Sequence, residues 1–504
     1  MGCLFVDCGR EAYIPMQILK GEVLYKDIFN IYAPLSYLFN AFLFKIFGEN
    51  LQVLYFAGFI TFGFVLTLFY KLLTLFCSKY NSFIIVICIL LLTSLSPNVF
   101  NFFLPYSYGM IYGLVSVLAS LYFLLRNRSN KDLYLASFLA GVAILNKYEF
   151  LPYLLPLTYC LFVRLKLSSK FALAFGSFLF PILLTFAILV SQGLNLVDIY
   201  KEFLILKEIM KSQTMMNFYS ITGVTFSLQH IPLFLLTFFS FLVLLFFKIK
   251  NCSKISFFIL LFFVALYTWY WLYKIFVFLP LTILILFGIR YKHLSKKIKI
   301  LVFSYFAISL KVFFSLMLFS YGSYFIGISL IVFSVLLPIS YRKAFVKLLS
   351  VISVVYFILS LFFLLTQSYS LKFDRIKLDN TTFYGVSFEQ VYSYLKENSN
   401  QDDVILAFPE EPMLNFALNR KGDSYLYSLI PMYVEVFGEE HIITRLKSTN
   451  ARYIIINDFD TGSYGYRRFG KDYAVRIMNY VENSYTQVFK TDKGLGQRIY
   501  RRND

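Results

Sequence analysis

The amino-acid sequence predicts a mainly α-helical, polytopic membrane protein of about twelve spans, with an α/β domain outside the membrane at its C-terminus. Three observations support this prediction. Of the 504 residues, 59% are hydrophobic and 15% are charged, whereas soluble domains are about 25% charged. Apolar runs long enough to cross a bilayer recur between residues 51 and 366. Charged residues return after residue 370, where the long apolar runs stop.

Apolar runs of roughly 15 to 25 residues are the expected spans, because about 20 apolar residues in a helix cross the hydrocarbon core. Segments 132–146 and 149–163 are barely separated, so they are either two crossings or one tight hairpin. The predicted spans are 51–76, 83–102, 108–125, 132–146, 149–163, 171–191, 231–247, 255–273, 275–289, 300–319, 322–340 and 346–366.

Loop charge predicts the topology. One set of alternate loops holds 19 basic residues and the other holds five, so by the positive-inside rule the first set is cytoplasmic. With an even number of spans, the N-terminal stretch and the C-terminal tail are both extracytoplasmic. The formal charge of +19 is therefore explained by membrane topology, and no nucleic-acid partner is expected. We expect a multi-pass protein of the cytoplasmic (inner) membrane, in contact with membrane lipids.

Three segments do not look like spans. Residues 34–48 are apolar but short and end at a glycine, which is typical of a helix lying at the membrane interface. Residues 199–211 predict a second surface helix, within the outer loop 192–230. The tail, residues 370–504, alternates helix-like and strand-like runs, which predicts a small α/β domain. Its helix-like runs are 388–398, 439–449 and 472–483, and its strand-like runs are 404–408, 453–456, 485–490 and 497–501.

The first 50 residues form the one long polar stretch before the predicted membrane domain of residues 51–366. They hold Asp7, Arg10 and Glu11, then Gly21-Glu-Val-Leu-Tyr25-Lys-Asp27, and then Tyr32-Ala-Pro34. A carboxylate can remove a proton from an attacking hydroxyl group, and cations can stabilise a phosphate leaving group. The alternative, without any catalytic role, is that these charges belong to an exposed polar N-terminus.

This stretch resembles the first external loop of GT-C-fold glycosyltransferases, in particular the bacterial protein-mannosyltransferase-like (glycosyltransferase family 39) group that includes the lipid A aminoarabinose transferases. The resemblance implies that Asp7 is the catalytic base and that Arg10 and Lys147 bind the phosphate of the donor. It also implies a polyprenyl-phosphate sugar donor and an extracytoplasmic acceptor, which is a glycan, a lipid or a protein. A single base without a second carboxylate nucleophile implies inversion, because retention usually needs a covalent intermediate.

Four further residues are candidates for supporting roles. Glu11 is expected to pair with Arg10 or to organise the loop. Tyr25 and Asp27 are candidates too, although a membrane-interface anchor for Tyr25 and an ordinary loop charge for Asp27 are the favoured explanations. Lys311 falls in the middle of a predicted span, where a charge is costly and usually functional. Lys147 borders the outer face, and extension of its side chain to the membrane surface is the alternative to phosphate binding.

The sequence departs from the family pattern at three points. Ala33 stands before Pro34, where the aminoarabinose-transferring relatives have Lys, so the identity of the donor is left open. The loop lacks the DxD-type pair of metal-dependent members, so we expect no obligatory metal and no cofactor. Only six residues precede Asp7, too few to span about 30 Å, so we expect that the family's first span is missing.

Two other functions compete with glycosyl transfer. A transporter or flippase of lipid-linked glycans would carry polar residues along several spans and related halves. Apart from Lys311 the predicted spans are nearly free of charge, and no repeat is visible. A non-catalytic membrane scaffold would leave the grouping of Asp7, Arg10 and Lys147 at the outer face unexplained.

Overall fold

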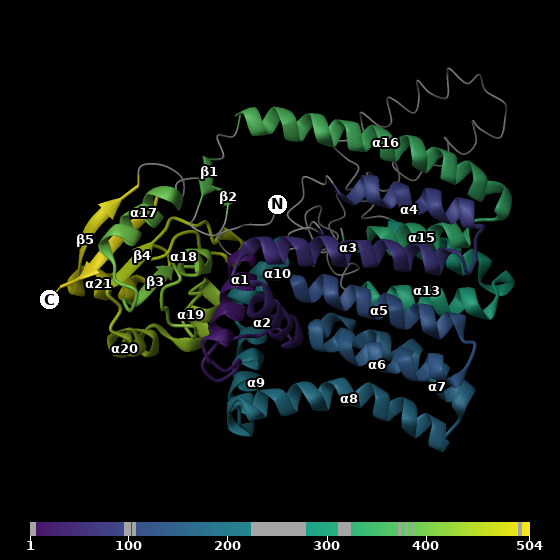
Figure 1. Ribbon diagram of the computed structural model, residues 1–504, viewed down its shortest axis with the longest axis horizontal. Coiled ribbons are helices and arrows are strands. Elements are labelled where there is room, and N and C mark those ends of the chain that lie inside the picture. Colours follow the sequence, from purple (N-terminus) through teal and green to yellow (C-terminus); the bar gives the residue numbers. More distant parts are fainter. Residues whose placement is uncertain are drawn as a thin grey trace. The chain divides into compact units, whose positions relative to one another are not determined.

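The computed structural model describes residues 7–94, 102, 107–222, 279–310, 324–370, 374–377, 382–385, 388–491 and 496–503. The described chain is mainly helical, with a small sheet near the C-terminus (Figure 1). It separates into two compact units. The first, called here the membrane unit, comprises residues 57–184 and 223–367. The second, called the site unit, comprises residues 2–56, 185–222 and 368–504.

The membrane unit consists of helices, several of which run side by side (Figure 1). Four helical stretches among the described residues are long and apolar enough to cross a membrane: 51–73, 108–126, 169–191 and 341–362. The chain is therefore a multi-pass membrane protein. The helices that contribute to this unit are α3 (Leu51–Leu73), α4 (Lys79–Ser94), α5 (Tyr108–Arg126), α6 (Asn130–Asn146), η1 (Tyr148–Tyr153), α7 (Leu154–Leu165), α8 (Ser169–Ser191), η2 (Tyr291–His293), α13 (Lys296–Ile308), α15 (Ile326–Leu336) and α16 (Ile339–Ser370).

Small residues bring these helices together. A Cβ atom at Gly113 of α5 would lie 2.5 Å from the Phe150 ring and 3.2 Å from the Ala143 carbonyl oxygen of α6. A Cβ atom at Gly141 of α6 would lie 2.4 Å from the Phe178 carbonyl oxygen of α8. Glycine therefore sets the spacing of α5, α6 and α8, as small residues do between membrane helices.

The predicted spans correspond to helices wherever the chain is described. Residues 231–247 and 255–273 lie outside the described residues, and 83–102, 275–289, 300–319 and 322–340 are described in part. The helices α6 and α7, predicted as a hairpin or as two crossings, are shorter than the four candidate spans. The total of twelve spans stays a prediction.

The site unit combines three stretches that are far apart in the sequence. The N-terminal stretch supplies α1 (Asp7–Leu19) and α2 (Leu35–Phe47), and the outer loop supplies α9 (Leu196–Lys211) and α10 (Gln213–Thr222). The C-terminal segment supplies β1 (Asp374–Lys377), β2 (Thr382–Gly385), α17 (Phe388–Asn398), β3 (Ile405–Phe408), α18 (Pro412–Leu418), α19 (Pro431–Phe437), α20 (Glu439–Thr449), β4 (Tyr453–Ile456), η4 (Gly462–Tyr464), α21 (Val475–Ser484), β5 (Tyr485–Lys490) and β6 (Arg498–Arg502).

The helices and strands predicted for the tail are confirmed. They form a four-stranded sheet in the order β3-β4-β6-β5. Strands β3 and β4 are parallel, with Ile405 opposite Tyr453, whereas β6 is antiparallel to both of its neighbours. The strands β3 and β4 are buried along their whole length, as expected where helices cover a sheet. The hairpin β1-β2 was not predicted.

A hydrophobic cluster around Phe29 joins the three stretches of the site unit. The buried ring of Phe29 lies 5.0 Å from Tyr433 and 5.1 Å from Phe437, both at near-perpendicular angles. Ile209 of α9 is buried in the same cluster. Burying a Phe side chain contributes about 2 to 3 kcal/mol, so this contact favours the association of the N-terminal stretch with the tail.

The N-terminal stretch begins with a helix, whereas the sequence analysis treated it as a loop. Helix α1 ends at Leu19, and Gly21 follows with a φ of 95° and an N–H bond to the Ile18 carbonyl oxygen, as in glycine C-terminal caps. The predicted interfacial helix is confirmed as α2 and ends at Gly48, with φ 89°. The predicted outer-loop helix is α9, which begins with a capping box formed by Asn195 and Asp198. Placement at the membrane surface stays a prediction for both.

Helix α1 packs directly against α18 of the tail. A Cβ atom at Gly9 would lie 2.6 Å from the backbone nitrogen of Met413, a separation that real Cβ atoms do not adopt. Because Met413 belongs to the first turn of α18, Gly9 permits the starts of the two helices to touch. The neighbours of Gly9 in α1 therefore lie close to the residues that precede α18.

We predict that Gly9→Ala destabilises the site unit by about 1 to 3 kcal/mol, because the contacted atom is backbone and cannot rotate away. At a helix position without such a contact, changing Gly to Ala stabilises the folded state by about 0.5 to 1 kcal/mol. A loss of stability in Gly9→Ala would therefore indicate that α1 contacts α18. Gly63→Ala in α3 is the matched control, because no described atom lies within 4 Å of its added Cβ. The measurement is the midpoint of heat-induced aggregation in detergent. Equal midpoints for the two variants would show that α1 does not touch α18.

Candidate active site

Asp7 and Arg10 lie one turn apart at the start of α1. The Arg10 Nη1 atom is 3.5 Å from the Asp7 Oδ1 atom, in an i,i+3 ion pair. Asp7 keeps 19% of its side chain exposed, whereas the Arg10 side chain is 5% exposed. A carboxylate in the first turn is also favoured by the helix dipole. The pair therefore places one accessible carboxylate beside a buried guanidinium.

Tyr32 and Glu11 fix the position of Arg10. Arg10 Nη1 donates to the Tyr32 hydroxyl at 3.4 Å, and Arg10 Cζ lies 4.5 Å from the centre of the Tyr32 ring. The Glu11 carboxylate lies 3.9 Å from Arg10 Nη2 and accepts a hydrogen bond of 3.3 Å from Tyr37 of α2. Since Glu11 is almost fully buried, it compensates the buried cation and links α1 to α2.

The other two loop candidates hold the backbone that carries Tyr32. The Tyr25 hydroxyl donates to the Tyr32 carbonyl oxygen at 2.6 Å, from a backbone with φ 70°. The Asp27 carboxylate accepts a hydrogen bond of 2.9 Å from the Val23 N–H. These contacts give Tyr25 and Asp27 structural roles in the loop.

The tail adds a carboxyl group that the sequence analysis missed. Glu410 follows β3 and Pro409, and it lies two residues before the α18 turn that contacts Gly9. Burial raises the pKa of Glu410 from the ordinary value of 4.5 to about 8, with a further contribution from the negative charge of Asp7. The positive charge of Arg10 acts in the opposite direction. Glu410 therefore holds a proton at neutral pH and completes what we call the charged cluster: Asp7, Arg10, Glu11 and Glu410.

The neighbouring Glu411 points into the tail. Its two carboxylate oxygens accept hydrogen bonds of 3.1 Å from Asn457 and 2.5 Å from Gln497. Burial raises its pKa to about 7, although these two hydrogen bonds favour the charged form. Glu411 thus belongs to the core of the tail, whereas Glu410 belongs to the charged cluster.

Three tyrosines of the tail lie close enough to Glu410 for its charge to affect their hydroxyl groups. Burial raises the pKa of the Tyr427, Tyr433 and Tyr464 hydroxyls, and the charge of Glu410 raises each further. The Tyr464 ring stacks on Phe218 of α10 at 4.9 Å. All three stretches of the site unit therefore contribute to the surroundings of the cluster.

Two exposed arginines, Arg467 and Arg468, follow Tyr464 closely in the chain. The carboxylate of Asp472 accepts hydrogen bonds from both of their backbone N–H groups, at 2.9 and 3.0 Å. This arrangement fixes the backbone of the loop and leaves the two guanidinium groups exposed.

Two of the predicted residues are not among the described residues of the site unit. Lys147 belongs to the membrane unit, at the end of α6, where it is buried and its Nζ atom lies 3.7 Å from the Glu149 carboxylate. Lys311 lies outside the described residues. Within the described ranges, no group of three or more His, Cys, Asp and Glu side chains could hold a metal ion. The expectation of a metal-independent protein stays a prediction.

No family model and no curated protein matches the sequence. Among solved structures, the chain is similar to an oligosaccharyltransferase of Archaeoglobus fulgidus in complex with zinc and sulfate, with 12% identity and a TM-score of 0.49 over 99% of this chain and 69% of that one. A structure of the same oligosaccharyltransferase tethered to an acceptor peptide gives 12% identity and a TM-score of 0.45, over 99% and 70% of the two chains.

The chain is also similar to ArnT from Cupriavidus metallidurans bound to undecaprenyl phosphate. This similarity has 11% identity and a TM-score of 0.44, over 98% of this chain and 94% of that one. Both neighbours are GT-C-fold proteins, the class that the N-terminal stretch resembles.

Proposed function

We propose that the protein is an inverting glycosyltransferase that moves a sugar from a polyprenyl-phosphate donor to an extracytoplasmic acceptor, with Asp7 as the general base. The acceptor is a glycan, a lipid or a protein. One observation carries the proposal: within the charged cluster, Asp7 is the carboxyl group that solvent reaches. Its side chain is 19% exposed, compared with residue exposures of 1% for Glu11 and 6% for Glu410.

The reaction is a direct displacement at the anomeric carbon of the donor sugar. Asp7 accepts the proton of the acceptor hydroxyl as its oxygen bonds to that carbon. The bond between the anomeric carbon and the phosphate oxygen breaks, and the lipid phosphate leaves with the electron pair. Cations near the departing oxygen stabilise the charge that develops there.

The charge of the cluster explains why more than one cation is required. Arg10 already lies against the carboxyl groups of Asp7 and Glu11, so its positive charge is engaged within the cluster. Binding of a donor phosphate therefore calls for other cations. Lys147 is one candidate from the resemblance, and the exposed Arg467 and Arg468 of the tail are two more.

Inversion of the anomeric configuration follows from the protonation of Glu410, the carboxyl group that would otherwise be a second candidate nucleophile. A retaining mechanism needs an ionised carboxylate that attacks the sugar and forms a covalent intermediate. Glu410 is protonated at neutral pH and buried, so it is a poor nucleophile. Glu11 is engaged with Arg10 and Tyr37. Asp7 therefore acts alone, and a single displacement inverts the configuration.

We predict that Asp7→Asn lowers kcat for transfer from a radiolabelled polyprenyl-phosphate sugar by about 100- to 10,000-fold, the usual range for a general base. Binding of the donor should change little, because the variant retains the other residues of the cluster. Asp402→Asn is the control, since this exposed carboxylate pairs with Lys421 and transfer should stay near the native rate. Native turnover in Asp7→Asn would exclude Asp7 as the base.

The pH dependence should report on Glu410. Its folded-state pKa is raised to about 8, so it is neutral at pH 7 and gains a negative charge above pH 8. That charge repels the donor phosphate, so kcat/KM for the donor should fall above pH 8.

Glu410→Gln cannot ionise and should extend activity to higher pH. Asp402→Asn is the control, because that exposed carboxylate pairs with Lys421 and should leave the profile unchanged. If Glu410→Gln reproduces the native profile, a group other than Glu410 is responsible for the alkaline limit.

A further inference from the structure

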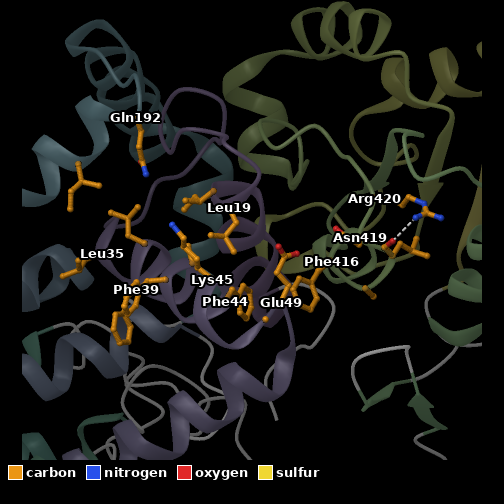
Figure 2. Close-up of a pocket in the computed structure, with 18 of the residues that line it drawn as sticks. Leu19, Leu35, Phe39, Phe44, Lys45, Glu49, Gln192, Phe416, Asn419 and Arg420 are labelled. Atoms are coloured by element: carbon orange, nitrogen blue, oxygen red, sulfur yellow. Dashed lines mark hydrogen bonds between the residues drawn. The ribbon is translucent and has the colours of Figure 1, made fainter.

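A cavity lies in the site unit, next to the end of α1 that is remote from Asp7. It has a volume of about 1190 Å³ and is lined by the end of α1, one face of α2, the last turns of α8, and α17 and α18 (Figure 2). Pockets for small molecules occupy about 300 to 1,000 Å³, so this cavity has room for a larger ligand.

One wall of the cavity is apolar and belongs to α2. Leu35, Leu38, Phe39 and Phe42 line it, and the rings of Phe39 and Phe42 stack at 6.5 Å. Phe39 is 43% exposed and Phe42 is 55% exposed. The face of α2 that points away from α1 is thus apolar, which is typical of a helix whose outer side meets lipid.

Hydrogen-bond donors and positive charge also line the cavity, from Lys45 near the end of α2 and from Gln192, Lys396 and Arg420 on the other elements. Figure 2 shows the ends of the Lys45 and Gln192 side chains pointing toward one another across the cavity. Among the charged lining residues, the cations Lys45, Lys396 and Arg420 outnumber the single acid Glu49. Arg420 is engaged with the tail, where it donates to the carbonyl oxygens of Leu418 and Ser399. Lys45 and Gln192 are therefore the groups directed at a ligand.

The position of the cavity separates it from the reaction centre. Ile18 and Leu19, at the end of α1, line the cavity, whereas Asp7 begins that helix. Eleven residues of α-helix span roughly 16 Å along the axis. The end of α1 that lines the cavity is therefore a different part of this helix from the turn that carries Asp7.

We propose that this cavity binds an anionic phospholipid of the surrounding membrane, with the phosphate at Lys45 and Gln192 and an acyl chain along Leu35, Phe39 and Phe42. Three observations favour this ligand. The cavity joins an apolar wall to an excess of positive charge, it is large enough for a lipid, and Thr185 and Ile188 in its lining end a membrane-spanning helix.

The test is native mass spectrometry of the purified full chain, titrated with phosphatidylglycerol or phosphatidylcholine. The native protein should retain phosphatidylglycerol preferentially. Lys45→Gln should weaken this binding about tenfold, which corresponds to the loss of one charge-assisted contact. Lys421→Gln is the matched control, because this exposed lysine of the same unit does not line the cavity and pairs with Asp402.

A second variant tests the apolar wall. Phe42→Ser should weaken the binding of phosphatidylglycerol, and because Phe42 is largely exposed the change should leave folding intact. Equal lipid retention by the native protein, Lys45→Gln and Phe42→Ser would overturn the proposal, as would equal binding of phosphatidylcholine. Displacement of phosphatidylglycerol by an equal concentration of polyprenyl phosphate would also overturn it, since the cavity would then hold the donor lipid.

Discussion

The contact between Gly9 and Met413 determines the rest of the site. Without a side chain at position 9, the first turn of α1 reaches the backbone of α18, and the N-terminal stretch meets the tail. Asp7 and Arg10 then lie close enough to Glu410 for their charges to shift its pKa. The buried rings around Phe29 hold the same stretches together a short distance along the chain. Packing therefore comes first, and the electrostatics of the site follow from it.

The burial of several charged groups in one place is costly, and the cluster offsets that cost in two ways. An unpaired buried ion costs several kcal/mol, but Arg10 lies against the carboxylates of Asp7 and Glu11 and over the Tyr32 ring. Glu410 avoids a further buried charge by keeping its proton. Desolvation is the largest cause of the raised pKa of Glu410, and repulsion by Asp7 adds to it. The result is one accessible, ionised carboxylate beside a neutral acid.

The sequence predicted what is encoded locally. Long apolar runs mark helices because a helix in lipid satisfies its own backbone. Short apolar runs marked β3 and β4 of the tail, and the helix-like run 439–449 marked α20. Helix α1 was missed because Gly9 and Pro15 interrupt a helical pattern. Among the site residues, Asp7, Arg10 and Glu11 were identified by resemblance to a family motif, and the structure places them together.

Glu410 could not have been found in the same way. The segment Pro409-Glu-Glu-Pro412 has the composition of a turn after a strand, and nothing local indicates which glutamate faces another segment. Its role depends on tertiary contacts between opposite ends of the chain. The only available signal was the pair of adjacent acids directly after the predicted strand 404–408. Tertiary contacts also determine that the site unit combines the N-terminal stretch, α9, α10 and the tail. The sequence therefore did not predict this unit.

The most direct test of this account is the titration of Glu410, followed by infrared spectroscopy of the protein in bilayers. A protonated carboxyl group gives its own C=O band, which is assigned to Glu410 if it disappears in Glu410→Gln and persists in Glu411→Gln. The account predicts a midpoint near pH 8 in the native chain. In Asp7→Asn the midpoint should be lower, because a neutral residue 7 no longer opposes ionisation of Glu410. An unchanged midpoint in Asp7→Asn would contradict the claim that the two carboxyl groups share one site.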